Sequence, residues 1–591
     1  MTDVKQLITE HLDIWLTAET EKKSGRGRSS GASSSIYGVQ KLRELILELA
    51  VLGKLTTQDP NEDAHQEFVE LYKDAIKLQK QQNFKTLDNK PTNIELGFEI
   101  PKNWHICVFD EIAAIARGGS PRPIKSFLTD ENDPDGVNWI KIGDSERGTI
   151  YINSTSEKIK AAGVSSSRMV YPDDLILSNS MSFGYPYIMN IEGCIHDGWL
   201  VIRTPKDKIN KLFLYYLLRS PYARKQFTKA AAGAVVQNLN ADKVKELVLP
   251  LPPLKEQQRI VAKVDELMQL CDQLEQQQNL STEAHEQLVD VLLNALTNSA
   301  NADEFQQNWQ RISANFDLLF TTDYSIEQLK QTVLQLAVMG KLVKQDPSDE
   351  PASELLKQIA EEKAKLVKEG KIKKSKPLPE ITDDEKPFEL PSGWAWTPLE
   401  NISSLITKGS SPKWQGVNYV NEGILFITSE NVGSYSLILD NLKYVEEKFN
   451  QIEPRSILEK NDFLMNIVGG SIGRTAIYDL DEVSNINQAV CLIRLFLEYL
   501  DKEFILHFFN SQICKYYMFD KQVDNARPNL SMGNIAKFII PIPPMLEQKR
   551  IVGKVNQLFS IIDQLRVLQA KARQTQLHLA DVLVANAVEG A

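Results

Sequence analysis

The chain contains 591 residues, of which 42% are hydrophobic and 25% charged, and its net charge is −11. A chain of this length is too long to fold around a single hydrophobic core, and it fits a globular protein with two domains and connecting segments. No stretch comes near the roughly 18 apolar residues of a membrane span, the first residues lack a secretion signal, and the five cysteines show no CxxC spacing. We therefore expect a cytoplasmic protein without a membrane partner, a disulfide framework or a zinc site.

The amino-terminal region, residues 1–98, is predicted to be helical. Residues 1–20 have an amphipathic pattern, and a linker rich in glycine, serine and arginine follows at 24–35. Residues 40–55 and 63–82 form two further predicted helices.

Two β-rich modules are predicted, the first over residues 99–252 and the second over residues 390–543. Short apolar segments bounded by turns predict strands at 137–142, 174–178 and 200–203, and at 423–428, 462–467 and 489–494. Helical stretches at 212–229 and 502–519 interrupt these strands. Each module is predicted to end in a strand that Pro-x-Pro-Pro stops, because proline cannot donate to a ladder.

Helical segments are predicted to follow both modules. Residues 253–389 begin with a long helix and include helices at 326–342 and 352–369, whereas residues 544–591 form one long helix. The predicted fold class is therefore α+β, with two mixed α/β modules joined by two long helices.

The sequence repeats itself at an offset near 290 residues. The block Pro-x-Pro-Pro-x-x-Glu-Gln-x-Arg-Ile-Val from Pro250 recurs 291 positions later from Pro541. Leu-Ala-Val-x-Gly-Lys-Leu-x-x-Gln-Asp-Pro at 49–60 recurs at 336–347, and the Pro-x-x-Trp that begins at Pro101 recurs at Pro391. Because the sequences between these blocks diverge, we expect the repeated frame to do one shared job while each module recognises something different.

Both long helices carry apolar residues at spacings of four and three, which is typical of a coiled-coil seam. The seam residues are Ile260, Val264, Leu267, Cys271 and Leu274, and Ile551, Val555, Leu558, Ile562 and Leu565. We expect the two helices to pair antiparallel, seam on seam, with the modules related by a pseudo-twofold axis. The amino-terminal helices would then lie beside the carboxy-terminal helix, as their repeats lie beside the first long helix, in a circular arrangement.

In the combination and order of these motifs, the chain resembles the DNA-specificity subunit of type I restriction-modification enzymes over nearly its full length. The resemblance implies two target-recognition domains, each reading one half of an asymmetric split site in double-stranded DNA, with the paired helices setting the gap. It implies two methyltransferase subunits and two restriction subunits as partners. Adenine methylation and ATP-dependent cleavage would then use S-adenosylmethionine, ATP and Mg in those partners, with no cofactor in this chain.

Two other functions remain open on the residues alone. One is a coiled-coil scaffold whose modules bind proteins, and the other is a stand-alone enzyme that modifies or cleaves DNA. Sequence-selective retention of DNA would separate the first from DNA recognition. Incubation of the purified chain with S-adenosylmethionine and DNA would test the second.

Two segments approach catalytic motifs without meeting their spacing. The turn from Gly469 to Thr475 has three residues rather than four between the relevant glycines and an arginine in place of lysine, so it fails the P-loop pattern. Cys194, His196 and Asp197 lack further partners at ligand or nucleophile spacing. We therefore predict no catalytic or metal site in this chain.

The net acidity does not favour nucleic acid, but the charge is uneven. Residues 99–252 carry 19 Lys+Arg against 17 Asp+Glu, and residues 203–229 carry eight basic residues and one acidic residue. A basic face is possible there, with a solvated helix face as the alternative.

Turns early in each module are the predicted DNA-reading elements, because such loops enter a groove and carry guanidinium or amide groups to base edges. The candidates are Arg117, Ser120, Arg122, Lys141, Arg147, Asn179 and Ser180, and Lys408, Lys413, Trp414, Asn431, Asn466, Arg474 and Arg527. On the long helices, Arg259, Lys263, Arg550 and Lys554 are predicted to contact spacer phosphates or the methyltransferase. A solvated helix face is the alternative for these four.

Overall fold

A computed structural model describes residues 4–19, 36–89, 94–146, 148–179, 184–231, 239–375, 377–520 and 530–589. The chain divides into two compact units, which we call unit 1 (Met1–Ser281 with Lys571–Ala591) and unit 2 (Thr282–Ala570). Each unit holds one β-rich module and parts of both long helices. The predicted linker at 24–35 and the candidate contacts Arg147, Ser180 and Arg527 lie outside the described residues.

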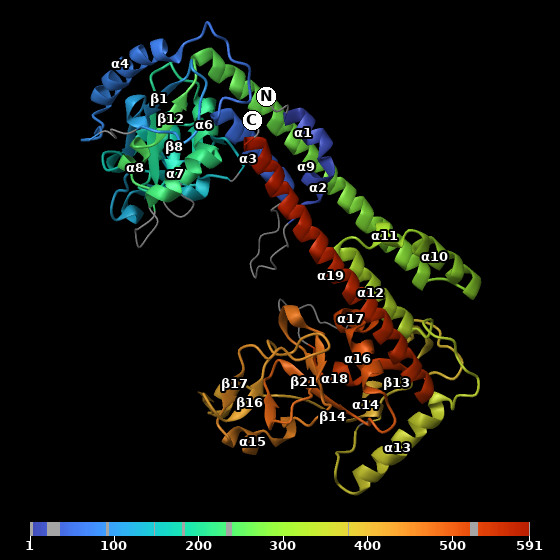
Figure 1. The fold of residues 1–591 in the computed structure, drawn as a ribbon. Coiled ribbons are helices and arrows are strands. Elements are labelled where there is room, and N and C mark those ends of the chain that lie inside the picture. Colours follow the sequence, from blue (N-terminus) through green and yellow to red (C-terminus); the bar gives the residue numbers. More distant parts are fainter. Residues whose placement is uncertain are drawn as a thin grey trace. The chain divides into compact units, whose positions relative to one another are not determined.

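The first module is closed by a two-stranded ladder between its start and its end. β1 (His105–Val108) pairs antiparallel with β12 (Val248–Leu251), as Figure 1 shows. Between them lies a sheet of order β2-β11-β8-β9-β5, formed by Ala114–Arg117, Trp199–Arg203, Leu175–Ser178, Pro186–Met189 and Tyr151–Ile152. A second sheet has the order β3-β6-β4-β10-β7, formed by Leu128–Thr129, Lys158–Ile159, Val137–Ile140, Gly193–Ile195 and Arg168–Val170.

Among the described residues, the second module repeats this topology with one edge strand fewer in each sheet, since it has no counterpart of β5 or β7. Its closing ladder pairs β13 (Ala395–Pro398) with β22 (Ile539–Ile542). The sheet β14-β21-β18-β19 is formed by Ser403–Lys408, Val490–Leu495, Phe463–Asn466 and Thr475–Ile477. The sheet β15-β17-β16-β20 is formed by Tyr419–Val420, Lys443–Val445, Ile424–Ile427 and Ser484–Ile486. The parallel pair β16/β20 corresponds to the parallel pair β4/β10, so the two modules share their strand order despite divergent sequences.

The proline blocks stop their strands later than predicted. Pro250 lies inside β12, opposite Ile106, and Pro541 lies inside β22, opposite Trp396. Both ladders have only two strands, so one edge of each strand needs no donor and accommodates a proline. The strands end one residue after the first proline of each block.

Each predicted helix inside a module is split in two. In the first module, α6 (Lys211–Arg219) ends before Ser220, and Pro221 begins α7 (Pro221–Ala231), because a proline ring fits only the first turn of a helix. In the second, α16 (Lys502–Asn510) and α17 (Gln512–Asp520) are separated by Ser511. The short helices of the modules are α5 (Ala161–Val164), α8 (Ala241–Lys245), α14 (Leu399–Ile402), α15 (Lys448–Ile452) and α18 (Met532–Ala536).

In unit 1, helices from both ends of the chain lie along the first half of α9 (Leu254–Thr297). These are α1 (Val4–Glu10), α2 (Leu12–Thr17), α3 (Tyr37–Val51) and the last turns of α19 (Met545–Glu589), whereas α4 (Ala64–Gln82) packs against β1 and β2 of the module. Arg43 of α3 donates to Asp272 and Glu275 of α9 at 2.7 and 2.8 Å, and the Tyr37 hydroxyl donates to Asp581 of α19 at 2.7 Å. The single helix predicted at 1–20 is interrupted at His11.

Unit 2 repeats this arrangement with the two long helices exchanged. Its helices are α10 (Ala302–Ala314), α11 (Phe316–Leu319), α12 (Asp323–Val338) and α13 (Ala352–Lys368). The Tyr324 hydroxyl of α12 donates to Asp290 at the end of α9, and Glu327 pairs with Arg566 of α19. Thus α3 and α12 occupy equivalent positions between the start of one long helix and the end of the other, which is the predicted circular arrangement.

The two seams differ from the prediction in what they pack against. The first seam, Ile260 to Leu274, is buried in the core of unit 1 with α3 and α6. The second, Ile551 to Leu565, packs into the core of unit 2 with α12 and α16. Each seam is thus covered by apolar residues of its own unit.

Candidate nucleic-acid interface

Four connections of the first module meet at one edge of its sheets. They follow β2, β4 and β8, and the fourth links β10 to β11. Asn179, after β8, donates its side-chain amide to the carbonyl of Asp197 at 3.0 Å, and the Arg117 Nε, at the end of β2, donates to the same carbonyl at 2.9 Å. The backbone N–H of Ile142, after β4, lies 3.2 Å from the His196 Nε2. The edge is therefore one hydrogen-bonded surface.

Asp197 organises the candidate residues of this edge. The Ser120 hydroxyl donates to Asp197 Oδ1 at 2.9 Å, and the Arg122 guanidinium lies 3.6 Å from Oδ2. Arg122 remains 83% exposed, so its charge faces solvent at the rim. Four candidates that are up to 62 residues apart in sequence thus contact Asp197: Arg117, Ser120, Arg122 and Asn179.

Burial acts in opposite directions on the two ionisable groups at the centre of the edge. Burial lowers the pKa of His196, although the neighbouring Asp197 carboxylate opposes this change. Burial would raise the pKa of Asp197, but the hydrogen bond from Ser120 and the charges of His196 and Arg117 lower it overall. The edge therefore holds a carboxylate that positions cations.

The same edge exists in the second module. The N–H of Asn487 donates to the carbonyl of Ile427 at 3.1 Å, which joins the β20–β21 connection to the end of β16. The side-chain amide of Asn466, at the end of β18, donates to the carbonyls of Ser429 and Val432 at 2.9 and 3.3 Å. The ends of β14, β16 and β18 and the β20–β21 connection thus correspond to the four connections of the first module.

A glycine brings the first loop against this edge in both modules. A Cβ on Gly118 would overlap the carbonyl of His196, and a Cβ on Gly409 would overlap the carbonyl of Ile486. Each glycine directly follows a basic residue, Arg117 or Lys408, so close backbone contact at the glycine determines where the cation lies.

The candidate residues fall into an exposed group and a buried group. Lys408, Lys413, Trp414 and Arg474 are exposed in the second module, as Arg117 and Arg122 are in the first. Lys141 is half-buried, and its ammonium lies 2.8 Å from the Glu157 carboxylate. Trp414 is 76% exposed, next to Lys413, which is unusual for so large an apolar side chain.

Three candidate asparagines lie in the interior, which differs from their predicted role as groove contacts. Asn179, Asn431 and Asn466 are at most 1% exposed. The Asn431 carbonyl oxygen accepts from the Thr428 hydroxyl at 3.0 Å, and its amide donates to the carbonyl of Ile438 at 3.1 Å. Their amides satisfy backbone groups of turns, because short polar side chains compete well for such groups. They shape the loops that carry the exposed residues.

Sequence reasoning missed two residues of the first edge. Asp197 had been considered only as part of a catalytic motif, although an acidic residue between a strand and a glycine is a common loop organiser. Arg168 donates its Nε to the carbonyl of Arg117 at 2.8 Å. Nothing in the spacing of Arg168 points to this contact, because a strand pairing brings it there.

The repeated blocks of the chain meet in a joint that occurs once in each unit. In unit 1, the Gln58 amide donates to Glu256 at 3.1 Å, and the Gln257 carbonyl oxygen accepts from the N–H of Asn210 at 2.9 Å. In unit 2, Gln345 donates to Glu547 at 3.1 Å, and Gln548 accepts from Asp501 at 2.8 Å. The repeated Gln-Asp-Pro and Glu-Gln residues therefore attach each module to its long helix.

Two of the four cations predicted to meet spacer DNA or a partner belong to this joint. The Arg259 guanidinium pairs with Glu62 at 2.8 Å and with Glu256 at 2.6 Å, and Arg550 pairs with Asp349. These intramolecular pairs explain why both arginines recur in the repeat. Lys263 pairs with Glu266 at 3.0 Å and Lys554 donates to Gln557 at 3.2 Å, both on the helix surface.

The basic run at 203–229 does not form one face. Arg203 pairs with Asp174 at 2.7 Å and is largely buried, whereas Lys208 and Lys211 pair with Glu70 and Asp173. The cations of the run that lack an ion pair with any described residue and remain exposed or half-exposed are Lys206, Arg219 on α6, and Arg224, Lys225 and Lys229 on α7.

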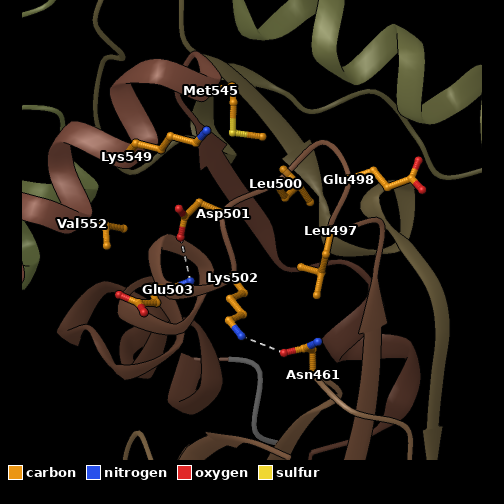
Figure 2. Close-up of a pocket in the computed structure, with 10 residues that line it drawn as sticks. All are labelled: Asn461, Leu497, Glu498, Leu500, Asp501, Lys502, Glu503, Met545, Lys549 and Val552. Carbon is orange, nitrogen blue, oxygen red and sulfur yellow. Dashed lines mark hydrogen bonds between the residues drawn. The ribbon is translucent and has the colours of Figure 1, made fainter. Parts of the chain in front are cut away.

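Figure 2 shows a depression of about 480 Å³ where α16 and α19 begin. Asp501 accepts from the N–H of Glu503 at 2.9 Å as the cap of α16, and Lys502 donates to Asn461 at 2.8 Å. Asp501 and Lys502 are therefore used in capping and in a contact within the module, and the charged residues Glu498 and Lys549 also line the depression. Among the residues that the structure describes, no group of three histidine, cysteine or acidic residues is arranged to hold a metal ion, and no helix is long and apolar enough to span a membrane.

Comparisons with known proteins agree with this architecture. Residues 101–284 and 391–571 match the family of the type I restriction modification DNA specificity domain. The chain is 34% identical to the type I restriction enzyme EcoAI specificity subunit of Escherichia coli, over 99% of this chain and 100% of that protein. It is 35% identical to the EcoEI specificity subunit of Escherichia coli, over 98% and 99%.

Among solved structures, a chain from a type I R-M system gives a TM-score of 0.47 at 18% identity, covering 83% of this chain and 99% of that chain. Each of the two family matches covers one β-rich module and the first part of the long helix that follows it. This chain therefore belongs to the family of DNA specificity subunits of type I restriction-modification systems.

Proposed function

We propose that this specificity subunit selects a bipartite, asymmetric site in double-stranded DNA, with one module reading each half-site across a fixed gap. The observation that carries the proposal is that one edge is built twice on one backbone plan but displays different exposed side chains. The first edge displays Arg117 and Arg122, and the second displays Lys408, Lys413 and Trp414. A shared plan suits a shared task, and different side chains suit different half-sites.

Direct readout of base edges is the mechanism that these groups support. A guanidinium on a rigid loop makes paired hydrogen bonds to guanine O6 and N7, and an exposed aromatic ring packs against bases or a thymine methyl group. Asp197 holds Ser120 and Arg122 before DNA arrives, so less side-chain freedom is lost on binding.

Two methyltransferase subunits are the proposed partners, and two restriction subunits join them for cleavage. Support for two copies of one partner comes from exposed apolar pairs that the repeat places on both long helices. Leu288 and Val291 are 50% and 64% exposed in unit 2, and their counterparts Leu579 and Val582 are 40% and 36% exposed in unit 1. A surface that occurs twice suits a partner that binds twice.

Catalysis is proposed to reside in those partners. S-adenosylmethionine, ATP and Mg would be held there, and this subunit would act without a catalytic residue of its own. Its role would be to place each methyltransferase over an adenine of one half-site, which the enzyme then flips out of the stack.

The proposal is tested by mapping methylated adenines in a host genome that expresses the methyltransferase partner with and without this chain. We expect a split motif with a fixed gap only when the chain is present. A stable complex that adds no methylation would contradict the proposal.

Loop variants make the test specific to each half-site. Arg117→Ala with Arg122→Ala should relax or abolish selection in one half of the motif, and Lys408→Ala with Lys413→Ala in the other half. The matched control is Arg311→Ala with Lys357→Ala, which removes two exposed cations from α10 and α13. If either loop variant altered both halves alike, the assignment of one module to one half-site would be wrong.

A further inference from the structure

Two arginines share one tyrosine ring in the first module. The Arg219 guanidinium carbon lies 4.8 Å from the centre of the Tyr185 ring, and that of Arg224 lies 5.6 Å from it. Arg224 also donates to the Tyr185 hydroxyl at 2.8 Å. Arg219 comes from the last turn of α6 and Arg224 from α7, so the fold brings them together.

The charge of this cluster is not balanced within the described part of the chain. No carboxylate there forms an ion pair with Arg219 or Arg224, whereas Arg203, Lys208 and Lys211 of the same basic run each have one. Two guanidinium groups around one ring repel each other, and the aromatic ring offsets only part of that repulsion. An anion is the natural complement of such a cluster.

The cluster flanks the candidate DNA-binding edge. Tyr185 follows Gly184, whose N–H donates to the carbonyl of Ser178 at 2.7 Å, directly before Asn179. Gly184 has a φ of +81° and is close to Phe227 of α7, one helical turn beyond Arg224. The helix that carries Arg224 is therefore packed against the loop that leaves β8 at that edge.

The second module places cations at the same point with different residues. Gly473 has a φ of +86°, its N–H donates to the carbonyl of Asn466 at 2.9 Å, and it is close to Met518 of α17. Arg474 follows Gly473 as Tyr185 follows Gly184. Lys515 precedes Met518 by three residues, as Arg224 precedes Phe227. Arg474 and Lys515 take part in no ion pair among the described residues.

We infer that Arg219 and Arg224 in the first module, and Arg474 and Lys515 in the second, are contact sites for DNA backbone phosphates beside each half-site. This inference rests on the proposed function. The sequence names Arg474 as a DNA-reading candidate and places Arg219 and Arg224 in the basic run at 203–229, whereas Lys515 is new. Phosphate contacts fix the position of a protein on the duplex without reading sequence. Their recurrence with different residues fits this role, because any cation binds a phosphate whereas base reading demands a particular side chain.

The test compares the salt dependence of DNA binding by the full chain in complex with its methyltransferase partner. In Arg219→Ala with Arg224→Ala, the slope of log affinity against log salt concentration should become less steep by about 1 for each lost phosphate contact. Between 50 and 200 mM salt, the loss of affinity should therefore be about tenfold smaller than in the wild type. The ratio of affinities for cognate and mismatched duplexes should stay unchanged. We expect the same two results for Arg474→Ala with Lys515→Ala in the second module.

Two controls separate charge from folding. Arg219→Lys with Arg224→Lys keeps both cations and should retain the wild-type slope. Arg311→Ala with Lys357→Ala loses the same charge elsewhere and should also retain it. A wild-type slope in Arg219→Ala with Arg224→Ala would overturn the inference, as would a flattened slope accompanied by relaxed discrimination between duplexes.

Two further outcomes are distinguishable. If inorganic phosphate raised the thermal stability of the wild type but not of Arg219→Ala with Arg224→Ala, and the DNA slope were unchanged, the cluster would bind a free anion and the inference would fail. If the wild-type complex showed no preference for any duplex, the proposed function itself would fail.

Discussion

At the scale of single residues, close backbone contact places the DNA-binding groups. Gly118 and Gly409 lie directly against a carbonyl of the facing connection, and each follows a basic residue. A methyl group in either place would push the loop away from the edge, and with it the exposed cations. The precision of the edge thus depends on two residues that have no side chain.

We predict that Gly118→Ala and Gly409→Ala each impair recognition of one half-site. The added Cβ overlaps backbone, which cannot move away cheaply, so we expect at least a tenfold loss in methylation of cognate DNA. Gly553→Ala on α19 is the control, because it lies outside both modules and a Cβ there meets nothing within 4 Å. Normal methylation by Gly118→Ala would show that the loop position is not critical.

His507 supplies a prediction about pH. This histidine of α16 is 3% exposed, and burial, with a smaller contribution from Lys330, lowers its pKa to about 4. Between about pH 4 and 6.5 the unfolded chain binds a proton that the folded chain does not, so stability falls as pH falls through this window. We expect His507→Gln to remove about 2 kcal/mol of the stability difference between pH 8 and pH 5. Denaturant unfolding of unit 2 at both pH values measures this difference. An identical pH dependence of stability in the wild type and in His507→Gln would contradict the prediction.

At the scale of elements, the repeated Gln-Asp-Pro and Glu-Gln residues form the joint between each module and its long helix. In each unit a glutamine from the segment after α3 or α12 bonds to a glutamate in the first turn of a long helix, and that glutamate is at most 1% exposed. Gln58 also donates to the carbonyl of Gly53 at 3.1 Å, and Gln345 donates to that of Gly340 at 2.6 Å. One side chain thus serves a helix end and a buried carboxylate together, which explains why these positions recur.

We predict that Gln58→Leu and Gln345→Leu each destabilise their unit by about 1–3 kcal/mol, because a buried carboxylate and a helix-terminal carbonyl lose their donor. Gln307→Leu, at an exposed position of α10, is the control. Denaturant midpoints measure the effect. A change within 0.5 kcal/mol, as is usual for surface positions, would mean that water replaces the donor.

At the scale of the whole molecule, two continuous helices carry the repeat. Residues 254–281 of α9 belong to unit 1 and residues 282–297 to unit 2, whereas α19 begins in unit 2 and ends in unit 1. Each unit is therefore completed by the end of the long helix that starts in the other. A change in the length of α9 or α19 therefore affects both units.

We predict that deleting residues 277–280 from α9 and the equivalent 568–571 from α19 shortens the gap of the DNA target by about two base pairs. Four residues rise about 6 Å along a helix, against about 3.4 Å per base pair. Both half-sites should stay the same, since no module residue changes. Methylation mapping measures the gap, and an unchanged gap in an active complex would exclude the helices as its ruler.

Much of this architecture is readable from the sequence, because it rests on repeats and periodicities. The duplication, the strands at 137–142 and 462–467, and the long helices after the proline blocks follow from local patterns that persist in the fold. The split after Asn510 is less visible, because one serine interrupts a pattern that otherwise continues, whereas Pro221 marks the split after Arg219 in the sequence itself.

The sequence by itself determined that two like modules sit on two long helices, since identities at one offset and heptad spacing are properties of the chain. Only the tertiary structure decided what each repeated residue does. Arg259 and Arg550 are ambiguous as isolated cations, and their partners Glu62 and Asp349 lie 197 and 201 residues away in sequence. The burial of Asn466 and the pairing of Arg219 with Arg224 at Tyr185 likewise depend on contacts between distant segments, which no local pattern records.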